Sequence, residues 1–312
     1  MGMLIEGQWT SEDRPRTGSG GEFLRPESPY RSAIGEPSFP AEAGRYHLFV
    51  NAGCPWAYRT ILYRSLKRLD GIISLSFTRP AAGAEGWTFV AGPEDGPEPV
   101  LGAVHMHDVY TAADARFTGR CTVPVLWDLQ RHTIVNNESS EIIRMLDSAF
   151  DGFPGVDPVR YYREELAAEI DELNGWIYAA VNNGVYRCGF AASQAAYEQA
   201  FDVLFDALDR LDARLRERRY LCGDVITEAD WRLFATLVRF DAAYYSQFRC
   251  NRNQLRDFAN LWPYTRDLYQ QPRVAETVDL QAIKGIYYGS RGLGVLPKGP
   301  QIDFMAPHNR GA

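Results

Sequence analysis

The stretch that decides the fold runs from Tyr46 to Ala57 and reads YHLFVNAGCPWA. Its first half is an apolar run typical of a buried strand, and Cys54 follows in a short loop directly before Pro55. Residues 59–69 then carry leucines at helical spacing. Because proline is favoured at the first helical position, the pattern predicts a strand, a loop and a helix that begins beside Cys54.

This placement predicts a reactive cysteine. The unpaired amides and the positive dipole end of a helix N-terminus favour the thiolate, which is the nucleophilic form of cysteine. The fourth position of the motif is Ala57, so a redox pair of two cysteines cannot form here. Any disulfide of Cys54 must therefore involve a thiol from elsewhere, which points to a small thiol such as glutathione. The alternative is a buried cysteine that packs as a small hydrophobe.

The bulk composition limits the class of protein. A chain of 312 residues is long enough for two domains, and its net charge is -7 without a cluster of lysine and arginine. This pattern gives no indication of nucleic-acid or membrane binding. The five scattered cysteines do not resemble a secreted disulfide framework, and residues 1–16 lack the apolar core of a signal peptide. We expect a cytoplasmic protein, in a compartment that supplies glutathione.

Metal binding is not expected from the sequence. His105 and His107 are close enough to bind one ion together, but no cysteine or paired carboxylate follows them at ligand spacing. The two histidines are therefore predicted to be loop surface, and no permanently bound cofactor is predicted.

Residues 1–44 are rich in glycine, proline and serine and predict an extended arm, and residues 45–150 then alternate between strand and helix patterns. After the first strand and helix come a strand at 72–77, a short helix near 109–117, strands at 122–127 and 133–135, and a helix at 141–149. Proline breaks a strand ladder, so Pro124 is expected at the strand start or edge, where a cis bond is plausible. This order is that of a thioredoxin-like domain, in which Cys54, Pro124 and the turn at 138–139 converge at one end of the sheet.

Residues 158–288 have a helical pattern. Amphipathic stretches cover 164–181, 193–215 and 227–248. The sequence from Thr227 to Asp230 has the form of a capping box, with aspartate in place of the usual glutamate. Residues 289–312 lack periodicity and predict a tail. The predicted fold is an α/β thioredoxin-like N-terminal domain followed by an all-α C-terminal domain.

This architecture is that of glutathione transferases, and several segments closely resemble the xi class, the glutathionyl-hydroquinone reductases. The segments are CPWA at 54–57, TVPVLWD at 122–128, IVNNESSEIIRML at 134–146, VNNGVY at 181–186, ITEADWRLF at 226–234 and VRFD at 238–241. The resemblance covers residues 45–288. One departure is Ile286, which stands where the family usually has a histidine before a Tyr-Tyr pair, and the run at 290–294 is shorter than usual. This concerns the substrate range more than the thiol chemistry.

The resemblance implies an enzyme that uses glutathione as co-substrate and acts on a small aromatic, quinone-derived molecule. Cys54 would attack the sulfur of a glutathionyl-hydroquinone, and a second glutathione would resolve the resulting mixed disulfide. The family also implies a homodimer. Two alternatives stay open: a glutathione-dependent thioltransferase, dehalogenase or ether-cleaving enzyme on another aromatic, and a non-catalytic binding protein of the same fold.

The glutathione site implied by the resemblance comprises five residues besides Cys54. The turn at Glu138 and Ser139 would bind the γ-glutamyl group, because a helix start offers amide donors to a carboxylate. The backbone of Val123, beside Pro124, would pair with the cysteinyl amide, and Trp87 would lie against glutathione. The alternative for Ser139 is a simple helix cap.

For the aromatic substrate, Tyr186 and Tyr287 match tyrosines that contact it in the family. The residues alone favour an ordinary packing tyrosine at each position. With the resemblance we expect both to serve catalysis together with Cys54.

Overall fold

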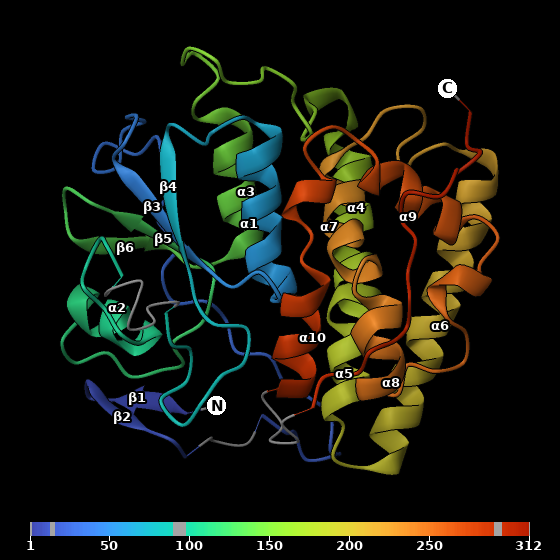
Figure 1. Cartoon of the computed structure of the whole chain (residues 1–312), viewed down its shortest axis with the longest axis horizontal. Helices are drawn as coiled ribbons and strands as arrows, with labels where there is room; N and C mark the ends of the chain where they lie inside the picture. The colour runs from blue at the N-terminus through green and yellow to red at the C-terminus, as the bar shows by residue number, and fades with distance from the viewer. Residues whose placement is uncertain (1, 13–15, 90–97, 290–294, 312) are drawn as a thin grey trace. The chain divides into compact units, whose positions relative to one another are not determined.

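The structure is a computed structural model that describes residues 2–12, 16–89, 98–289 and 295–311 (Figure 1). The chain divides into two compact units. The sheet unit comprises Met1–Pro15, Glu27–Val159 and Thr277–Leu296, and the helical unit comprises Arg16–Pro26, Arg160–Glu276 and Pro297–Ala312.

The sheet unit is built on a four-stranded sheet with the order β4-β3-β5-β6. The strands are β3 (Tyr46–Val50), β4 (Ile73–Phe77), β5 (Val125–Asp128) and β6 (Thr133–Asn136). Strand β3 is parallel to β4 and antiparallel to β5, and β5 is antiparallel to β6. All residues of β3 are buried, as expected for the apolar run at the centre of a sheet.

Three helices surround this sheet as the thioredoxin-like prediction requires. Helices α1 (Pro55–Leu66) and α3 (Ser139–Ser148) pack side by side on one face, and α2 (Met106–Ala113) lies on the other side (Figure 1). Helix α1 begins at Pro55 with Cys54 as its N-cap residue, as predicted. The Val123–Pro124 bond is cis and directly precedes β5, which keeps the proline out of the strand ladder.

The N-terminal arm contains a hairpin that its composition did not indicate. Strands β1 (Met3–Ile5) and β2 (Gln8–Thr10) are antiparallel. The amide of Leu4 donates to the carbonyl of Gly119 at 2.8 Å, and the amide of Gly119 donates back at 3.0 Å. Met3 and Leu4 are buried. Apolar residues at the start of the arm therefore hold it to the sheet unit.

The helical unit consists of α4 (Ala167–Ile177), α5 (Gly184–Phe190), α6 (Gln194–Glu217), α7 (Glu228–Leu237), α8 (Tyr245–Gln247) and α9 (Leu261–Tyr269). Short 3-10 turns lie at Glu164–Leu166, Leu255–Asp257 and Ala275–Thr277. The capping box is confirmed, since the amide of Thr227 donates to the carboxylate of Asp230 at 2.7 Å.

Two predicted helices of this unit are interrupted by π-helical turns, at Tyr178–Asn182 and Phe240–Tyr244. At the first, the buried side-chain amide of Asn182 donates to the carbonyl of Arg232 at 3.1 Å and to the hydroxyl of Thr236 at 2.8 Å. A π turn adds a residue and shifts the phase of the side chains that follow, which an amphipathic pattern does not reveal. In the described ranges, no helix is both long and apolar enough to cross a membrane.

Helix α10 (Leu280–Tyr288) groups with the sheet unit by its packing, although the sequence pattern assigns it to the helical domain. A Cβ atom at Gly53 would lie 2.4 Å from the carbonyl oxygen of Ala282 and 2.9 Å from Cγ2 of Ile286. A Cβ atom at Gly285 would lie 2.6 Å from Cβ of Pro80. Gly53 therefore lets α10 approach the loop before Cys54, and Gly285 lets the same helix approach Pro80. Part of the predicted tail, 290–294 and 312, lies outside the described residues.

Candidate active site

Cys54 is held at the start of α1 with 7% of its surface exposed. Its amide donates to the carbonyl of Asn51 at 3.1 Å and to the side-chain oxygen of Asn51 at 3.2 Å. Its Sγ atom lies 3.9 Å from the carbonyl oxygen of Val123. The fold thus brings the predicted nucleophile together with the predicted cis-proline loop.

Asn51 is a part of this site that the sequence analysis missed. Its side chain is fully buried, and its oxygen accepts hydrogen bonds from the amides of Gly53 and Cys54. Its nitrogen donates to the hydroxyl of Thr78 at 2.9 Å and to the carbonyl of Arg79 at 2.8 Å. Asparagine often folds back on the backbone in this way, so its place after a strand was the available signal. It fixes the loop that presents the thiol.

Tyr110 connects the cis-proline loop to the turn at the start of α3. Its hydroxyl donates to the carbonyl of Thr122 at 3.0 Å and accepts from the side-chain amide of Asn137 at 3.0 Å. The ring is fully buried, and this burial raises the pKa of the hydroxyl. Tyr110 therefore acts as a neutral donor and acceptor that keeps two parts of the candidate glutathione site in register.

Glu138 and Ser139 lie at the first turn of α3. Glu138 is the N-cap, and its carboxylate accepts from the amide of Ser140 at 3.1 Å, from the Ser140 hydroxyl at 2.8 Å and from the hydroxyl of Ser28 at 3.1 Å. Ser139 is the first helical residue and is buried. The alternative that Ser139 is the helix cap is therefore wrong, because Glu138 fills that role.

Arg59 is a second residue that the sequence did not single out. It is 2% exposed, its guanidinium lies 4.8 Å from the centre of the Trp56 ring, and Nη1 is 3.4 Å from the hydroxyl oxygen of Ser139. It lies on the helix that begins at Cys54 and reaches the helix that begins at Ser139. A positive charge beside a helix N-terminus suits an anionic group.

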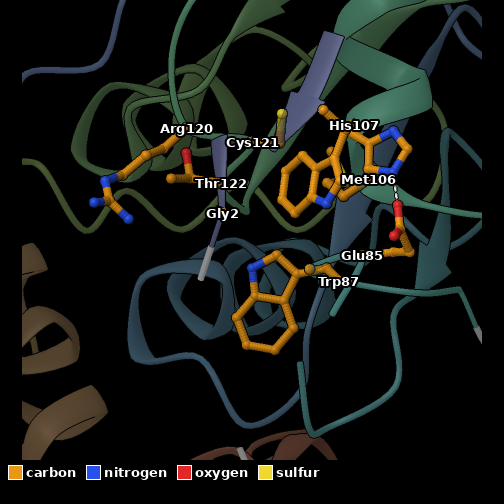
Figure 2. A pocket seen from close by; sticks show the side chains of 10 residues that line it. Gly2, Glu85, Trp87, Met106, His107, Arg120, Cys121 and Thr122 are labelled. Carbon is orange, nitrogen blue, oxygen red and sulfur yellow. Dashed lines mark ion pairs between the residues drawn. The ribbon is translucent and has the colours of Figure 1, made fainter. Parts of the chain in front are cut away.

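Trp87 lines a small pocket of the sheet unit (Figure 2). The ring is 7% exposed, and its neighbours around the pocket include Arg120, Cys121 and Thr122. Burial lowers the pKa of Arg120 and raises the pKa of Cys121 to about 12. The pocket therefore combines an aromatic wall, a cation and a thiol that stays protonated.

The two predicted tyrosines lie in different units. Tyr287 lies on α10 next to Ile286, is buried, and belongs to the same unit as Cys54. Tyr186 lies on α5 of the helical unit, where the guanidinium of Arg25 is 4.8 Å from the centre of its ring. Nε of Arg25 donates to the side-chain oxygen of Asn183 at 2.8 Å. Arg25 was not predicted, since it comes from the glycine- and proline-rich arm.

Both halves of the chain match known family models. Residues 53–149 match the glutathione S-transferase N-terminal domain, and residues 194–267 match the glutathione S-transferase C-terminal domain. The glutathionyl-hydroquinone reductase PcpF of Sphingobium chlorophenolicum is 47% identical over 304 residues, which cover 96% of each chain. The chain belongs to the glutathione transferase family.

Solved structures refine this assignment to the xi class. A xi-class transferase from Natrialba magadii superimposes with a TM-score of 0.93 at 42% identity and covers 99% of this chain and 97% of its own. The glutathione-bound structure of YqjG from Escherichia coli K-12 has a TM-score of 0.87 at 42% identity over 99% of each chain. The fold and family predicted from the sequence are confirmed.

Burial makes Cys222 and Cys250 of this transferase poor nucleophiles. All five cysteines lie in the described part of the chain, are buried and form no disulfide bond. Burial raises the pKa of Cys222 to about 11 and raises that of Cys250 as well. A thiol with so high a pKa is protonated at neutral pH and reacts slowly. Cys54, at a helix start, is the cysteine whose surroundings favour the thiolate.

The two histidines near Trp87 differ from the loop surface that the sequence predicts. The transferase brings Glu85 to His105 and His107, with one ligand atom from each within 4.8 Å of the others. The side chain of His107 is only 13% exposed. Glu85 could not be identified from spacing, because nineteen residues lie between it and His105 along the chain.

Proposed function

We propose that this xi-class transferase is a glutathionyl-hydroquinone reductase, which removes glutathione from glutathionyl-hydroquinones through a Cys54–glutathione mixed disulfide. The observation that carries the proposal is a single thiol at the start of α1, 3.9 Å from the Val123 carbonyl, with Ala57 in place of a second cysteine. The near full-length similarity to PcpF, which is named for this activity, supports it.

Glutathione would bind along the turns that surround Cys54. The first turn of α3 and the guanidinium of Arg59, next to the Ser139 hydroxyl, offer donors to its γ-glutamyl carboxylate. The carboxylate of Glu138 would receive its ammonium group, and the backbone of Val123 beside Pro124 would pair with its cysteinyl amide.

The glycyl end of glutathione needs an apolar surface to pack against and a cation to pair with its carboxylate. Trp87 supplies an aromatic surface, and Arg120 lines the same pocket with a guanidinium that would pair with the glycyl carboxylate (Figure 2). Burial lowers the pKa of Arg120, yet an arginine keeps its charge at neutral pH.

The reaction is an exchange at sulfur. The substrate reacts as the keto tautomer, in which the ring carbon that carries sulfur also carries a proton. The Cys54 thiolate forms a bond to the glutathione sulfur, the bond from sulfur to the ring carbon breaks, and its electron pair restores the aromatic ring as a phenolate. A proton on the phenolate oxygen completes the hydroquinone. A second glutathione thiolate then attacks the mixed disulfide, releasing oxidised glutathione and the Cys54 thiolate.

The phenolate that forms in the first step needs a hydrogen-bond donor. The hydroxyls of Tyr287 and Tyr186 would serve, because a donor that meets a developing negative charge lowers the barrier. Ile286 offers no donor, so this enzyme would rely on the tyrosines without an adjacent imidazole.

Ile286 also favours a second candidate activity. With an apolar Ile286 beside Tyr287, the aromatic pocket suits a less polar substrate, such as a glutathionyl ether or a halogenated hydroquinone. The thiol chemistry of Cys54 would be unchanged. We further propose that the protein is a homodimer, as the xi-class resemblance implies, and that it is cytoplasmic, as its scattered cysteines indicate.

A steady-state screen tests this assignment. The enzyme and glutathione are mixed separately with a glutathionyl-hydroquinone, a glutathionyl ether and a halogenated hydroquinone, and the products and oxidised glutathione are quantified by chromatography. We expect one hydroquinone and one oxidised glutathione per glutathionyl-hydroquinone consumed. Faster turnover of another substrate would favour the second candidate, and no turnover together with no glutathione adduct on Cys54 would favour a binding protein.

A further inference from the structure

Glu85, His105 and His107 form a cluster of metal-ligating side chains outside the residues of the thiol chemistry. One ligand atom from each lies within 4.8 Å of the others. Nε2 of His107 is 3.4 Å from a carboxylate oxygen of Glu85, the pair joined by a dashed line in Figure 2. The rings of the two histidines are stacked with their centres 5.0 Å apart. All three residues lie in the sheet unit.

Nδ1 of each histidine ring has a polar neighbour, so Nε2 is the ring nitrogen through which each could bind a metal ion. Nδ1 of His107 is 3.1 Å from the carboxylate of Asp108, and Nδ1 of His105 is 3.2 Å from the hydroxyl of Thr88. When Nδ1 of His107 donates to Asp108, Nε2 carries a lone pair. A carboxylate that receives the proton of a ligating histidine is a common support of metal sites.

An unprotonated Nε2 of His107 that faces a carboxylate favours the binding of a cation between the two groups. This nitrogen is buried and has no hydrogen-bond partner in the described residues, while the Glu85 carboxylate faces it. A lone pair and a carboxylate repel one another at this distance. Either a second proton on His107 or a metal ion between the two groups removes the repulsion.

The N-terminal hairpin keeps this arrangement in place. The indole of Trp9 stacks on the His107 ring with centres 4.7 Å apart and an interplanar angle of 26°. Its Nε1 donates to the carbonyl of Ala84, the residue before Glu85, at 3.1 Å. The same tryptophan therefore contacts both sides of the cluster, so the ligands are oriented before any ion binds.

We propose that Glu85, His105 and His107 bind a transition-metal ion, for which Zn²⁺ is the best match. Two imidazoles and one carboxylate form a ligand set that Zn²⁺ accepts, with a fourth position left for water, whereas Mg²⁺ and Ca²⁺ prefer oxygen ligands alone. The ion would join the loop that carries Trp87 to the start of α2. The amide of Met106 already donates to the carbonyl of Trp87 at 2.8 Å across this junction.

Titration with Zn²⁺ tests the site in the full chain. The Cys54→Ser variant is used throughout, because a reactive thiolate also binds zinc. We expect one equivalent of Zn²⁺ to bind, and His105→Gln and His107→Gln each to weaken the affinity by at least about tenfold. His132→Gln, a histidine of the turn between β5 and β6, is the matched control and should leave the affinity unchanged. With Co²⁺ as the probe, weak visible bands without thiolate charge transfer are expected.

Two outcomes would overturn the proposal: no binding of Zn²⁺ to the Cys54→Ser protein, or binding that His105→Gln and His107→Gln leave within twofold. Either result would make Glu85, His105 and His107 a set of structural polar contacts that binds no metal. If the histidine variants do not fold, Glu85→Gln gives the same test, since that side chain is 52% exposed and its replacement spares the core. Because the readout is metal binding, the result is independent of the reductase activity.

Discussion

The candidate site residues of the sheet unit and Tyr186 of the helical unit are positioned by different means. Cys54, Pro124 and Glu138 stand where a strand or helix begins, so the backbone itself brings them to the site. The surroundings of Tyr186 include side chains from distant segments, such as Arg25 of the arm and Phe248. The comparison indicates that the thiol chemistry depends on backbone geometry, while the aromatic side depends on tertiary packing.

The largest effect should come from Cys54→Ser. We expect the reductase rate to fall by more than about a thousandfold, because serine cannot form the mixed disulfide. The measurement is the release of hydroquinone under steady-state conditions. Cys222→Ala is the matched control, since burial raises the pKa of that thiol to about 11 and it should not take part.

Alkylation at neutral pH independently compares the reactivity of Cys54 with that of the other cysteines. Burial raises the pKa of Cys121 to about 12, so this thiol should react only when the pH becomes strongly alkaline. Iodoacetamide at pH 7 should therefore label Cys54 in preference to the other four cysteines. Substantial activity of Cys54→Ser, or equal labelling of Cys121, would contradict the proposed mechanism.

The next effect concerns the affinity for glutathione. Ser139→Ala should raise the Michaelis constant for glutathione by about ten- to a hundredfold, because a contact with a charged group contributes about 1.5–3 kcal/mol. Ser148→Ala, near the other end of α3, removes a hydroxyl that donates to the carbonyl of Arg144 within the helix, and serves as control. If Ser139→Ala leaves the Michaelis constant for glutathione unchanged, the Ser139 hydroxyl contacts Arg59 only for structural reasons and does not bind glutathione.

Much of the fold could be predicted because the signals for it are local. A proline at the first position of α1, a proline directly before β5 and the capping box at Thr227 each act within a few residues, and the structure confirms all three. The thioredoxin-like order followed from the same kind of pattern.

What the sequence did not reveal depends on residues that are far apart along the chain. Arg59 reaches Ser139, Asn51 reaches Thr78, and Arg25 reaches Asn183. Each of these polar residues would be assigned to the surface on composition alone. Only the fold shows that Arg59 and Asn51 are buried, and that Arg25 is half-buried against its partner. The grouping of Glu85 with two histidines escaped prediction for the same reason.

A substitution at Gly53 would disturb the backbone of the loop before Cys54 while leaving the thiol itself unchanged. In Gly53→Ala the new Cβ would lie 2.4 Å from the carbonyl oxygen of Ala282, so the loop or α10 must move. Overpacking of this kind typically costs about 1–3 kcal/mol of unfolding free energy, and the reductase rate should fall with it. Gly71→Ala is the control, since no atom lies within 4 Å of its Cβ position. Equal denaturation midpoints for the two variants would show that α10 does not constrain the loop.

The smallest effect on the rate should come from the hydroxyls of Tyr287 and Tyr186, and it should distinguish their role from that of the Cys54 thiol. Tyr287→Phe and Tyr186→Phe remove one hydroxyl each and keep the ring, so we expect each to slow hydroquinone release about tenfold, the contribution of one hydrogen bond to a developing charge. The reaction of Cys54 with a simple mixed disulfide forms no phenolate and should stay nearly unchanged. Tyr162→Phe, whose hydroxyl donates to exposed Asp171, is the control. Equal slowing of both substrates would make the tyrosines supports of the fold or of the glutathione site. If neither variant changes the rate, the aromatic substrate does not contact these two tyrosines. The hydroquinone assignment would then depend on Cys54 alone.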